Sequence, residues 1–299
     1  GFKQYWHSRK ESTENLLQEI NRYAGYYDRI YHGEMEGKEA EAACAAFRVS
    51  ASRLPAPFLM EAARLYLQNQ IPESAFARTV CLIDSYLTRR ALCGMDNSQL
   101  GRYFPILLRS VMRTFTKTHG DFHAITVNDL VIYNRSNANV MPTDEQLRVQ
   151  LKEINAYSLM VLRPVLERIE QDGASVKVDT SSLNIEHIMP QHPNAWWKKH
   201  AGTANEDEYA FYANLIGNLT LCAQDDNTRM GNEDFAYKKK ILGKTMHIRM
   251  NTEILQSPVW NKDTILKRCD ELAERIIAIY PYEEENVRQD ERTEDDVLV

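Results

Sequence analysis

The segment with residue types suited to catalysis spans residues 184–191 and reads NIEHIMPQ. It is a short apolar run with β-strand character at its start, it carries Glu186 beside His187, and a proline ends it. Further along, the chain continues with IGNLTLC, which contains Asn218, and then with Asn227. A carboxylate, an imidazole and two side-chain amides are groups with which a one-metal site can hydrolyse a phosphodiester.

Each of these residues has a chemical role that it can fill. His187 can take a proton from the attacking water, because a neutral imidazole is available near neutral pH. Glu186 offers a hard carboxylate oxygen to Mg²⁺ or Mn²⁺, and Asn227 offers a neutral oxygen. Neighbouring side chains of a strand point to opposite faces, so Glu186 and His187 reach one site only if the strand twists or ends there. Asn218 follows a glycine, and its amide is suited to bridging the loop that holds this geometry.

The composition bounds the class of protein. The chain has 299 residues and ordinary hydrophobic content, which is enough for two domains that each bury a core. We find no long apolar run and no signal peptide, so we expect a cytoplasmic protein without a membrane segment. The five cysteines are scattered without a C-x-x-C pair, which favours buried thiols over a zinc ribbon or disulfides. The first residue is Gly rather than Met, which predicts further residues upstream.

The negative charge of the chain is concentrated at its end. Residues 283–296 hold eight acidic residues and two arginines, a net charge of −6 that equals the net charge of the whole chain. We therefore predict that residues 283–299 form a disordered acidic tail. The remainder is neutral, so affinity for DNA must come from local basic patches and is expected to be modest.

Residues 1–178 are predicted to form an all-α domain. Apolar residues at helical spacing, with prolines and glycines between the runs, indicate successive helices, the last of which has Pro164 as an expected kink. We find no catalytic constellation and no repeat of fixed period in this part. It is interpreted as a scaffold or partner-docking domain. An alternative is an oligomerisation element, which would make the protein a homo-oligomer.

Residues 179–282 are predicted to form a second, smaller domain. Residues 175–179 (SVKVD) alternate in polarity and give the first strand-like signal. A strand near residue 185, a strand over 219–222, and helices over 206–214, 232–242 and from Trp260 to Ile279 follow. The expected fold class is mainly α: an all-α helical domain followed by a small ββα unit with helical elaborations.

Taken together, the motifs E-H-I-M-P-Q, I-G-N-L-T-L, a later Asn and G-N-x-x-F-x-x-K-K resemble the HNH (His-Me finger) nuclease superfamily. More closely, they are similar to the C-terminal nuclease domain of GmrSD-type restriction proteins and their phosphorothioate-sensing relative SspE. The resemblance covers about residues 180–280, including a closing pattern of Trp260, Ile265 and Arg268. It implies a ββα-metal (HNH) domain. The helical half matches less distinctly.

The resemblance also implies roles for individual residues. His187 matches the general base, and Glu186 matches the acidic metal ligand beside it. Asn218 matches the Asn that orders the loop and so belongs with His187 among the catalytic positions. Asn227 matches the final metal-ligand position. The implied cofactor is Mg²⁺ or Mn²⁺.

Basic and polar residues near these positions are implied contacts of DNA. Lys238 falls where the family carries a helix lysine near the phosphate, and Gln191 and Lys239 are further phosphate-binding or DNA-binding candidates. Lys239 and Lys240 can equally be surface charges. His192 and His200 are alternative ligands. The sequence has no zinc cysteines, which this branch of the superfamily does not require.

The resemblance implies a metal-dependent DNA endonuclease that nicks DNA, including modified phage DNA, in a bacterial anti-phage restriction system. GmrSD-type proteins carry an N-terminal nucleotide-hydrolysing sensor domain, and nothing in residues 1–178 resembles it, since no G-x-x-x-x-G-K-[ST] motif occurs. A sensor is therefore expected elsewhere, in cis or in trans. The alternative is a catalytically degenerate HNH-like module that binds DNA or a protein.

Overall fold

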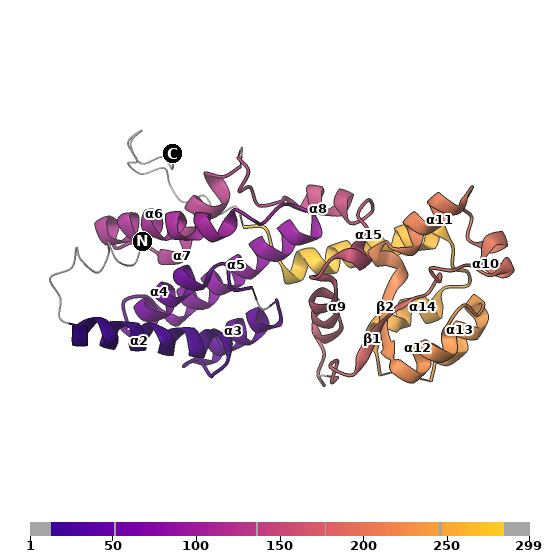
Figure 1. The fold of residues 1–299 in the computed structure, drawn as a ribbon, viewed down its shortest axis with the longest axis horizontal. Helices are drawn as coiled ribbons and strands as arrows, with labels where there is room; N and C mark the ends of the chain where they lie inside the picture. Colours follow the sequence, from indigo (N-terminus) through magenta and orange to yellow (C-terminus); the bar gives the residue numbers. More distant parts are fainter. Residues whose placement is uncertain (1–12, 51, 136, 177, 245–246, 284–299) are drawn as a thin grey trace. The chain divides into compact units, whose positions relative to one another are not determined.

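The contacts of the protein divide it into two units. The structure, a computed structural model, describes residues 13–50, 52–135, 137–176, 178–244 and 247–283 (Figure 1). Unit 1 comprises residues 1–83, 98–140 and 283–299, and unit 2 comprises residues 84–97 and 141–282. Residues 141–178, which the sequence places in the helical domain, are assigned by these contacts to the same unit as the strands. The predicted acidic tail lies, except for Glu283, outside the described residues.

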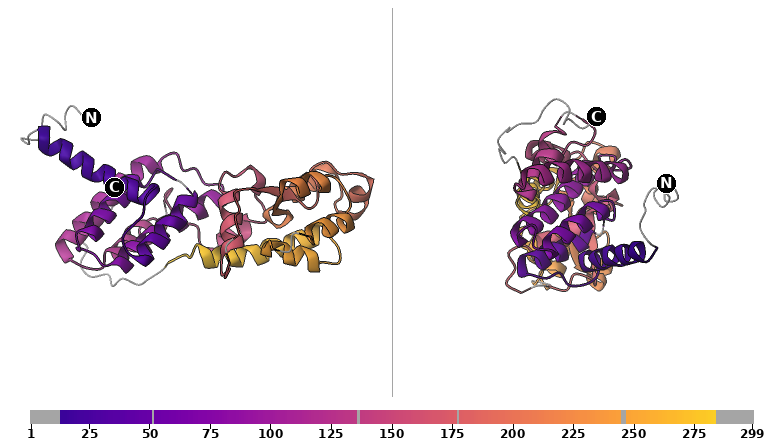
Figure 2. Two further views of the ribbon diagram at one scale, coloured as in Figure 1. Left: turned by 90° about the horizontal axis from the view of Figure 1, so that it is seen from below. Right: turned by 90° about the vertical axis from the view of Figure 1, so that its left-hand side faces the viewer.

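Unit 1 is built from helices, as the sequence predicts. Pro55 precedes the first residue of α4, and the Asp121 side chain caps α7 by accepting from the N–H groups of His123 and Ala124. Helix α2 packs against α3 and α4, and α4 packs against α6 (Figures 1 and 2). The elements are α2 (Thr13–Tyr31), α3 (Lys38–Ser50), α4 (Ala56–Leu67), the first part of α5 (Glu73–Leu92), α6 (Leu100–Thr118), α7 (Phe122–Val127) and the π-helical turn η1 (Asn128–Ile132).

The core of unit 1 is rich in phenylalanine. Phe47, Phe58, Phe76 and Phe104 are fully buried, one on each of the helices α3, α4, α5 and α6. The expected apolar face of α2 is only partly buried, because Leu16 and Ile30 lie in the core while Ile20 is exposed.

Unit 2 contains the two strands and the remaining helices. Asparagine side chains cap three of its α-helices, Asn194 on α10, Asn205 on α11 and Asn261 on α15. Its elements are the second part of α5, α8 (Asp144–Gln150), η2 (Ala156–Ser158), α9 (Leu162–Gln171), β1 (Leu183–His187), α10 (Ala195–His200), α11 (Glu206–Ala213), η3 (Ile216–Asn218), β2 (Leu219–Ala223), α12 (Gln224–Met230), α13 (Phe235–Leu242), η4 (Arg249–Asn251), α14 (Thr252–Gln256) and α15 (Lys262–Ile279).

Strands β1 and β2 form a two-stranded antiparallel sheet. The register pairs Leu183 with Ala223, Asn184 with Cys222, Ile185 with Leu221, Glu186 with Thr220 and His187 with Leu219. The two motifs recognised in the sequence, around residues 186 and 218, are therefore brought together at one end of this sheet.

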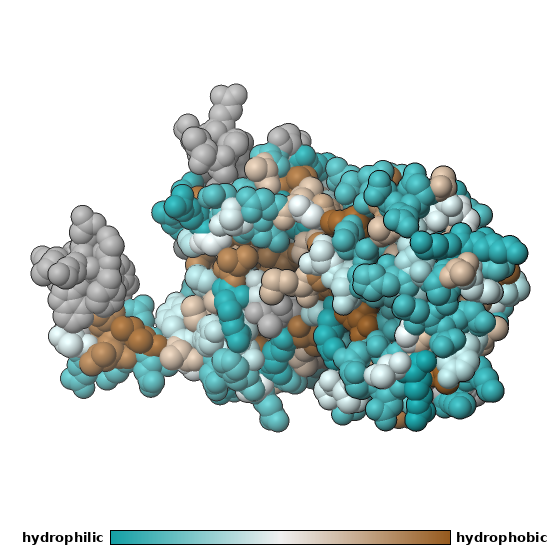
Figure 3. Space-filling view, turned by 45° about the vertical axis from the view of Figure 1, so that its right-hand side comes forward, coloured by the Kyte–Doolittle hydropathy of each residue, from teal (hydrophilic) through white to brown (hydrophobic). Residues whose placement is uncertain are grey.

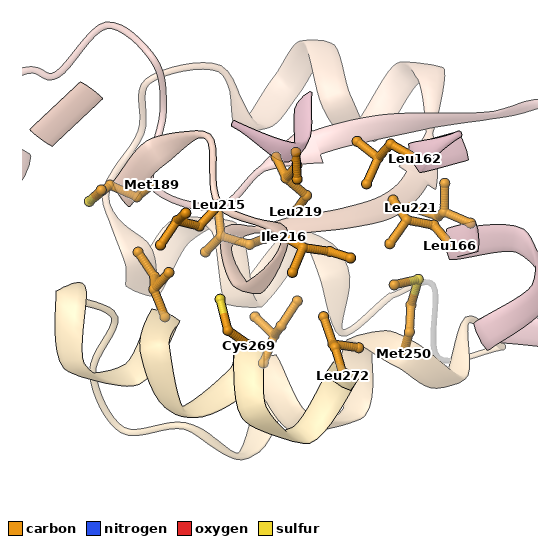
Figure 4. Close-up of a cluster of buried hydrophobic side chains, with 14 of the residues drawn as sticks. Leu162, Leu166, Met189, Leu215, Ile216, Leu219, Leu221, Met250, Cys269 and Leu272 are labelled. Carbon is orange, nitrogen blue, oxygen red and sulfur yellow. The ribbon is translucent and has the colours of Figure 1, made fainter. Parts of the chain in front are cut away.

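Helix α15 supplies much of the core of unit 2. It packs against the 3-10 turn η3, and Figure 4 shows Cys269 and Leu272 of this helix directed toward Ile216 and Leu219. Gly217 allows this approach, because a Cβ at that position would lie 2.1 Å from the Ile265 carbonyl oxygen and 2.9 Å from the Cys269 nitrogen. The glycine of I-G-N-L is therefore required by close packing of the turn on α15.

The structure corrects several local expectations. The described residues of 175–179 form no strand, because a polarity alternation without a pairing partner does not make one. Pro164, expected within a helix, lies in the first turn of α9, where proline is tolerated. Helices α10 and α12 were not expected. All five cysteines are free thiols, but Cys81 is exposed and Cys93 is only partly buried.

Among the described residues, no helix is both long enough and apolar enough to span a membrane. The face seen in Figure 3 is mainly hydrophilic, with separate hydrophobic patches.

Candidate active site

Glu186 and His187 lie at the end of β1, and their side chains have different partners. Glu186 is 6% exposed and His187 is 9% exposed. The Glu186 carboxylate contacts Lys238 of α13, whereas the His187 ring contacts Asn214 and Tyr157. The strand ends at His187, as expected, and neighbouring side chains leave it on opposite faces. If both side chains serve one site, as the sequence predicts, that site must therefore lie at the end of the strand, where it can be reached from both faces.

Lys238 forms a buried ion pair with Glu186. Its ammonium Nζ donates to Glu186 Oε1 at 2.7 Å and to the His187 carbonyl oxygen at 2.8 Å, and its side chain is fully buried. Burial raises the pKa of Glu186 and lowers the pKa of Lys238, while the attraction between the two groups opposes both shifts. The predicted phosphate-binding lysine is thus bound to the end of β1 in this structure.

The imidazole of His187 is held in one tautomer. Asn214 Oδ1 lies 3.3 Å from His187 Nε2 and also accepts from Gln191 Nε2 at 3.0 Å, while Asn214 Nδ2 donates to the Ala210 carbonyl. Because Oδ1 is the acceptor, Nε2 of neutral His187 carries the proton. Nδ1 then holds the lone pair. Burial lowers the pKa of His187 to about 4, so the ring is neutral at neutral pH.

Two contacts of His187 had no signal in the sequence. Tyr157 of η2 meets the imidazole edge-on, with ring centroids 4.4 Å apart, and Asn214 follows the C-terminal end of α11. Neither residue belongs to a recognisable motif, so only tertiary packing could identify them. Gln191, predicted as a DNA contact, is exposed and bonded to Asn214.

The side-chain amide of Asn218 forms four hydrogen bonds to other groups of the protein. Its Oδ1 accepts from the Met189 N–H at 2.8 Å and from Trp260 Nε1 at 2.9 Å. Its Nδ2 donates to the carbonyl groups of Met189 at 2.8 Å and Ala213 at 2.7 Å. These bonds hold the chain at Met189, two residues beyond His187. The Asn218 amide therefore acts on His187 indirectly, by fixing the backbone of Met189.

The closing pattern of the sequence contacts the turn η3. Trp260 bonds to Asn218, and the Ile265 carbonyl lies against Gly217. Buried Arg268 donates to the carbonyl groups of Gly217 at 2.9 Å and of Leu219 at 2.7 Å. Motifs that are far apart in the chain therefore share one function, which is to fix the turn that leads into β2.

Asn227 lies on α12 beside β1. Its Nδ2 donates to the Ile185 carbonyl at 3.2 Å, and its side chain also bonds to Cys222. Burial raises the pKa of the Cys222 thiol, and the nearby Glu186 carboxylate raises it further, so Asn227 and Glu186 have a common neighbour. Within the described ranges, no three His, Cys, Asp or Glu side chains gather as a cation site. One carboxylate and one amide fit a cation that takes its other ligands from substrate phosphate and water.

The remaining candidates are Lys239, His200 and His192. The Lys239 ammonium donates to the Ser257 carbonyl at 2.7 Å and lies over the Phe235 ring. The His200 ring stacks on Trp196 with centroids 4.3 Å apart. His192 is exposed. Among the residues that the structure describes, neither of these two histidines contacts Glu186 or His187, so the geometry favours neither as a ligand partner for them.

Comparison with known proteins identifies the family of this region. Residues 141–275 match the model of the C-terminal domain of GmrSD restriction endonucleases. This region is similar to the C-terminal domain of those enzymes. The match begins where the second segment of unit 2 begins, and it contains every predicted site residue. A search of curated proteins found no match. The GmrSD-type domain belongs to restriction endonucleases, which supports a nuclease role with DNA as the substrate.

Proposed function

We propose that the GmrSD-type domain hydrolyses phosphodiester bonds of DNA with His187 as the general base. The observation that carries this proposal is the fixed, neutral imidazole at the end of β1. Its Nε2–H is bonded to Asn214, which leaves Nδ1 to accept a proton from water. The low pKa keeps this lone pair available over the whole neutral range.

The residues around His187 orient the base. Asn214 fixes the tautomer, Tyr157 restricts the ring, and Asn218 holds the following loop through Met189. Lys238 binds the His187 carbonyl oxygen and thereby fixes the backbone of the base itself. Removal of one such contact should lower the rate by misplacing Nδ1 rather than by removing it.

Glu186 and Asn227 are the residues that would hold a divalent cation, Mg²⁺ or Mn²⁺. When bound, the cation neutralises charge on the scissile phosphate and stabilises the leaving oxygen. Lys238 contacts Oε1 of Glu186, so it competes with a cation for that oxygen. Metal affinity in the absence of DNA is therefore expected to be low, because substrate phosphate supplies part of the ligand set.

The biological context is proposed on the same family membership. A restriction nuclease of this type would nick DNA of an invading phage, with a nucleotide-hydrolysing sensor in cis or in trans that recognises modified DNA and controls cutting. Activity on unmodified DNA would then be weak.

The test is conversion of supercoiled DNA to open circles with Mn²⁺ or Mg²⁺, with EDTA as the metal-free control. The substrates are plain plasmid and circular DNA that carries modified bases. His187→Ala should abolish cutting while retaining the wild-type circular dichroism spectrum. His247→Ala, which changes an exposed histidine of the same unit, should cut like the wild type. Cutting by His187→Ala at the wild-type rate would refute the assignment of the base.

A second function is favoured by the Glu186–Lys238 pair. A carboxylate already neutralised by a buried ammonium suits a degenerate module that binds DNA or a protein without chemistry. Isothermal titration with Mn²⁺ in the presence of uncleavable phosphorothioate DNA distinguishes the two. Heat of metal binding that Glu186→Gln abolishes supports the nuclease, whereas absence of metal binding together with absence of cutting supports the binding module.

A further inference from the structure

A cavity outside the candidate active site is lined by aromatic side chains. It has a volume of about 430 Å³ and lies among α10, α13 and the segment that precedes α15. Its walls include Trp196, His200, Phe235, Lys239 and Trp260. Pockets for small molecules usually measure about 300–1,000 Å³ and combine apolar walls with few polar groups. The volume and lining of this cavity fit a planar aromatic ligand.

The rings form one stacked pair and one tilted pair. Trp196 and His200 stack with an interplanar angle of 20°, and Phe235 and Trp260 are tilted by 32° with centroids 5.5 Å apart. Lys239 Nζ uses one of its three protons on the Ser257 carbonyl, which leaves donors for oxygen or nitrogen acceptors of a ligand. Aromatic faces with a nearby ammonium are the groups that hold an unstacked nucleobase.

Unpaired basic side chains accompany the cavity. On α10, Lys199 follows Trp196 by three residues, and on α13, Lys240 follows Ala236 by four, so each lies on the helix face that lines the cavity. Lys198 and Lys262, by contrast, are paired with glutamates. In the described part of the chain, neither Lys199 nor Lys240 has an ion-pair partner, and both are exposed. These two lysines are available for phosphates on either side of a bound base.

We propose that this cavity binds a single base of the DNA outside the base stack, with Lys199 and Lys240 on the flanking phosphates. The proposal rests on the proposed function only in taking DNA as the substrate. The Trp260 indole N–H is bonded to Asn218, and Lys239 adjoins Lys238 in sequence. The cavity wall therefore includes or adjoins residues that also hold the end of β1. A base bound in the cavity would position the DNA strand relative to His187.

Binding of a fluorescent single-stranded oligonucleotide to the whole chain tests the proposal. The measurement is made in EDTA, so that no cutting occurs, with one oligonucleotide that carries bases and one of the same length that is fully abasic. The wild type should bind the first more tightly. Trp196→Ala should weaken this binding about five-fold or more, which is the effect of losing one stacked base, and should leave abasic binding unchanged. Tyr237→Ala removes an exposed aromatic ring of α13 that does not line the cavity, so it should change binding by less than about two-fold.

Equal affinity of the wild type for the two oligonucleotides, or wild-type binding by Trp196→Ala, would overturn the proposal. Titration with dAMP addresses a free nucleotide as the occupant. Binding of dAMP that Trp196→Ala abolishes, without any effect of that variant on the oligonucleotide, would also overturn it. Because the readout is binding without metal, base-dependent affinity can persist when plasmid cutting fails, and the two proposals are tested separately.

Discussion

The buried pair of Glu186 and Lys238 gives a quantitative prediction. Lys238→Met removes the ammonium but keeps a long apolar side chain, so the Glu186 carboxylate remains buried without its counter-charge. The side chain of Lys238 is 0% exposed and that of Glu186 is 8% exposed, so water cannot replace the lost partner. Removal of one member of a buried ion pair costs about 3–5 kcal/mol of unfolding free energy. We expect the unfolding free energy of unit 2 to fall by an amount in this range.

The double variant, with both Lys238→Met and Glu186→Gln, measures the interaction between the two charges apart from their other contacts. Glu186→Gln alone leaves Lys238 buried with a neutral acceptor and should cost less than Lys238→Met. In the double variant neither charge is left uncompensated. Its cost should therefore fall short of the sum of the single variants by about 2 kcal/mol, within the range measured for coupled contacts. Lys240→Met, an exposed lysine of the same helix, should change stability by less than about 0.5 kcal/mol.

Urea unfolding at neutral pH, followed by tryptophan fluorescence, measures these effects. Three of the four tryptophans lie in unit 2, at positions 196, 197 and 260, so the signal reports mainly on that unit. The view that the pair is buried and coupled would be refuted by either of two results. One is a loss of unfolding free energy in the double variant that equals the sum of the losses in the single variants. The other is a loss below about 1 kcal/mol in Lys238→Met.

Three further predictions concern the site and its support. The pKa of His187 is about 4 in the folded protein and 6.5 without the fold, so the unfolded chain binds the extra proton and stability is lost as pH falls through that window, by up to about 3 kcal/mol. His187→Gln should lack this loss in urea titrations at pH 7 and pH 4.5, and an identical pH dependence in both proteins would exclude the low pKa. Gly217→Ala places a Cβ against α15 and should cost about 3 kcal/mol or more, seen as a lower thermal midpoint; an unchanged midpoint would disprove the close approach. Asn214→Leu should keep the fold and reduce kcat for plasmid nicking about ten-fold or more through loss of the tautomer, whereas undiminished kcat would assign the orientation of His187 to other groups.

The sequence by itself predicted the local elements with strong signals. Prolines and glycines bounded most helices of unit 1, and the motifs around residues 186 and 218 marked β1 and β2. The prediction from sequence failed where the structure depends on contacts between distant residues. Residues 175–179 alternate in polarity like a strand, but those of them that the structure describes have no pairing partner. Residues 224–230 form a helix within a segment that carries no strong periodicity.

The family could also be recognised from the sequence, because motif residues keep their types and spacing wherever they lie in space. The reason for those types became visible only with the fold. Asn218 has to be an amide because it accepts two hydrogen bonds and donates two, and Gly217 has no room for a side chain beside α15.

Tertiary structure alone decided which partners surround the candidate base. Asn214, Tyr157 and the bond from Lys238 to the His187 carbonyl come from three separate elements, and none has a recognisable spacing from His187. The pKa of His187 is likewise set by burial, which depends on how the elements pack rather than on neighbours in the chain. Residue type and spacing encode the chemistry that is available, whereas packing determines the tautomer, the charge and the access of each group.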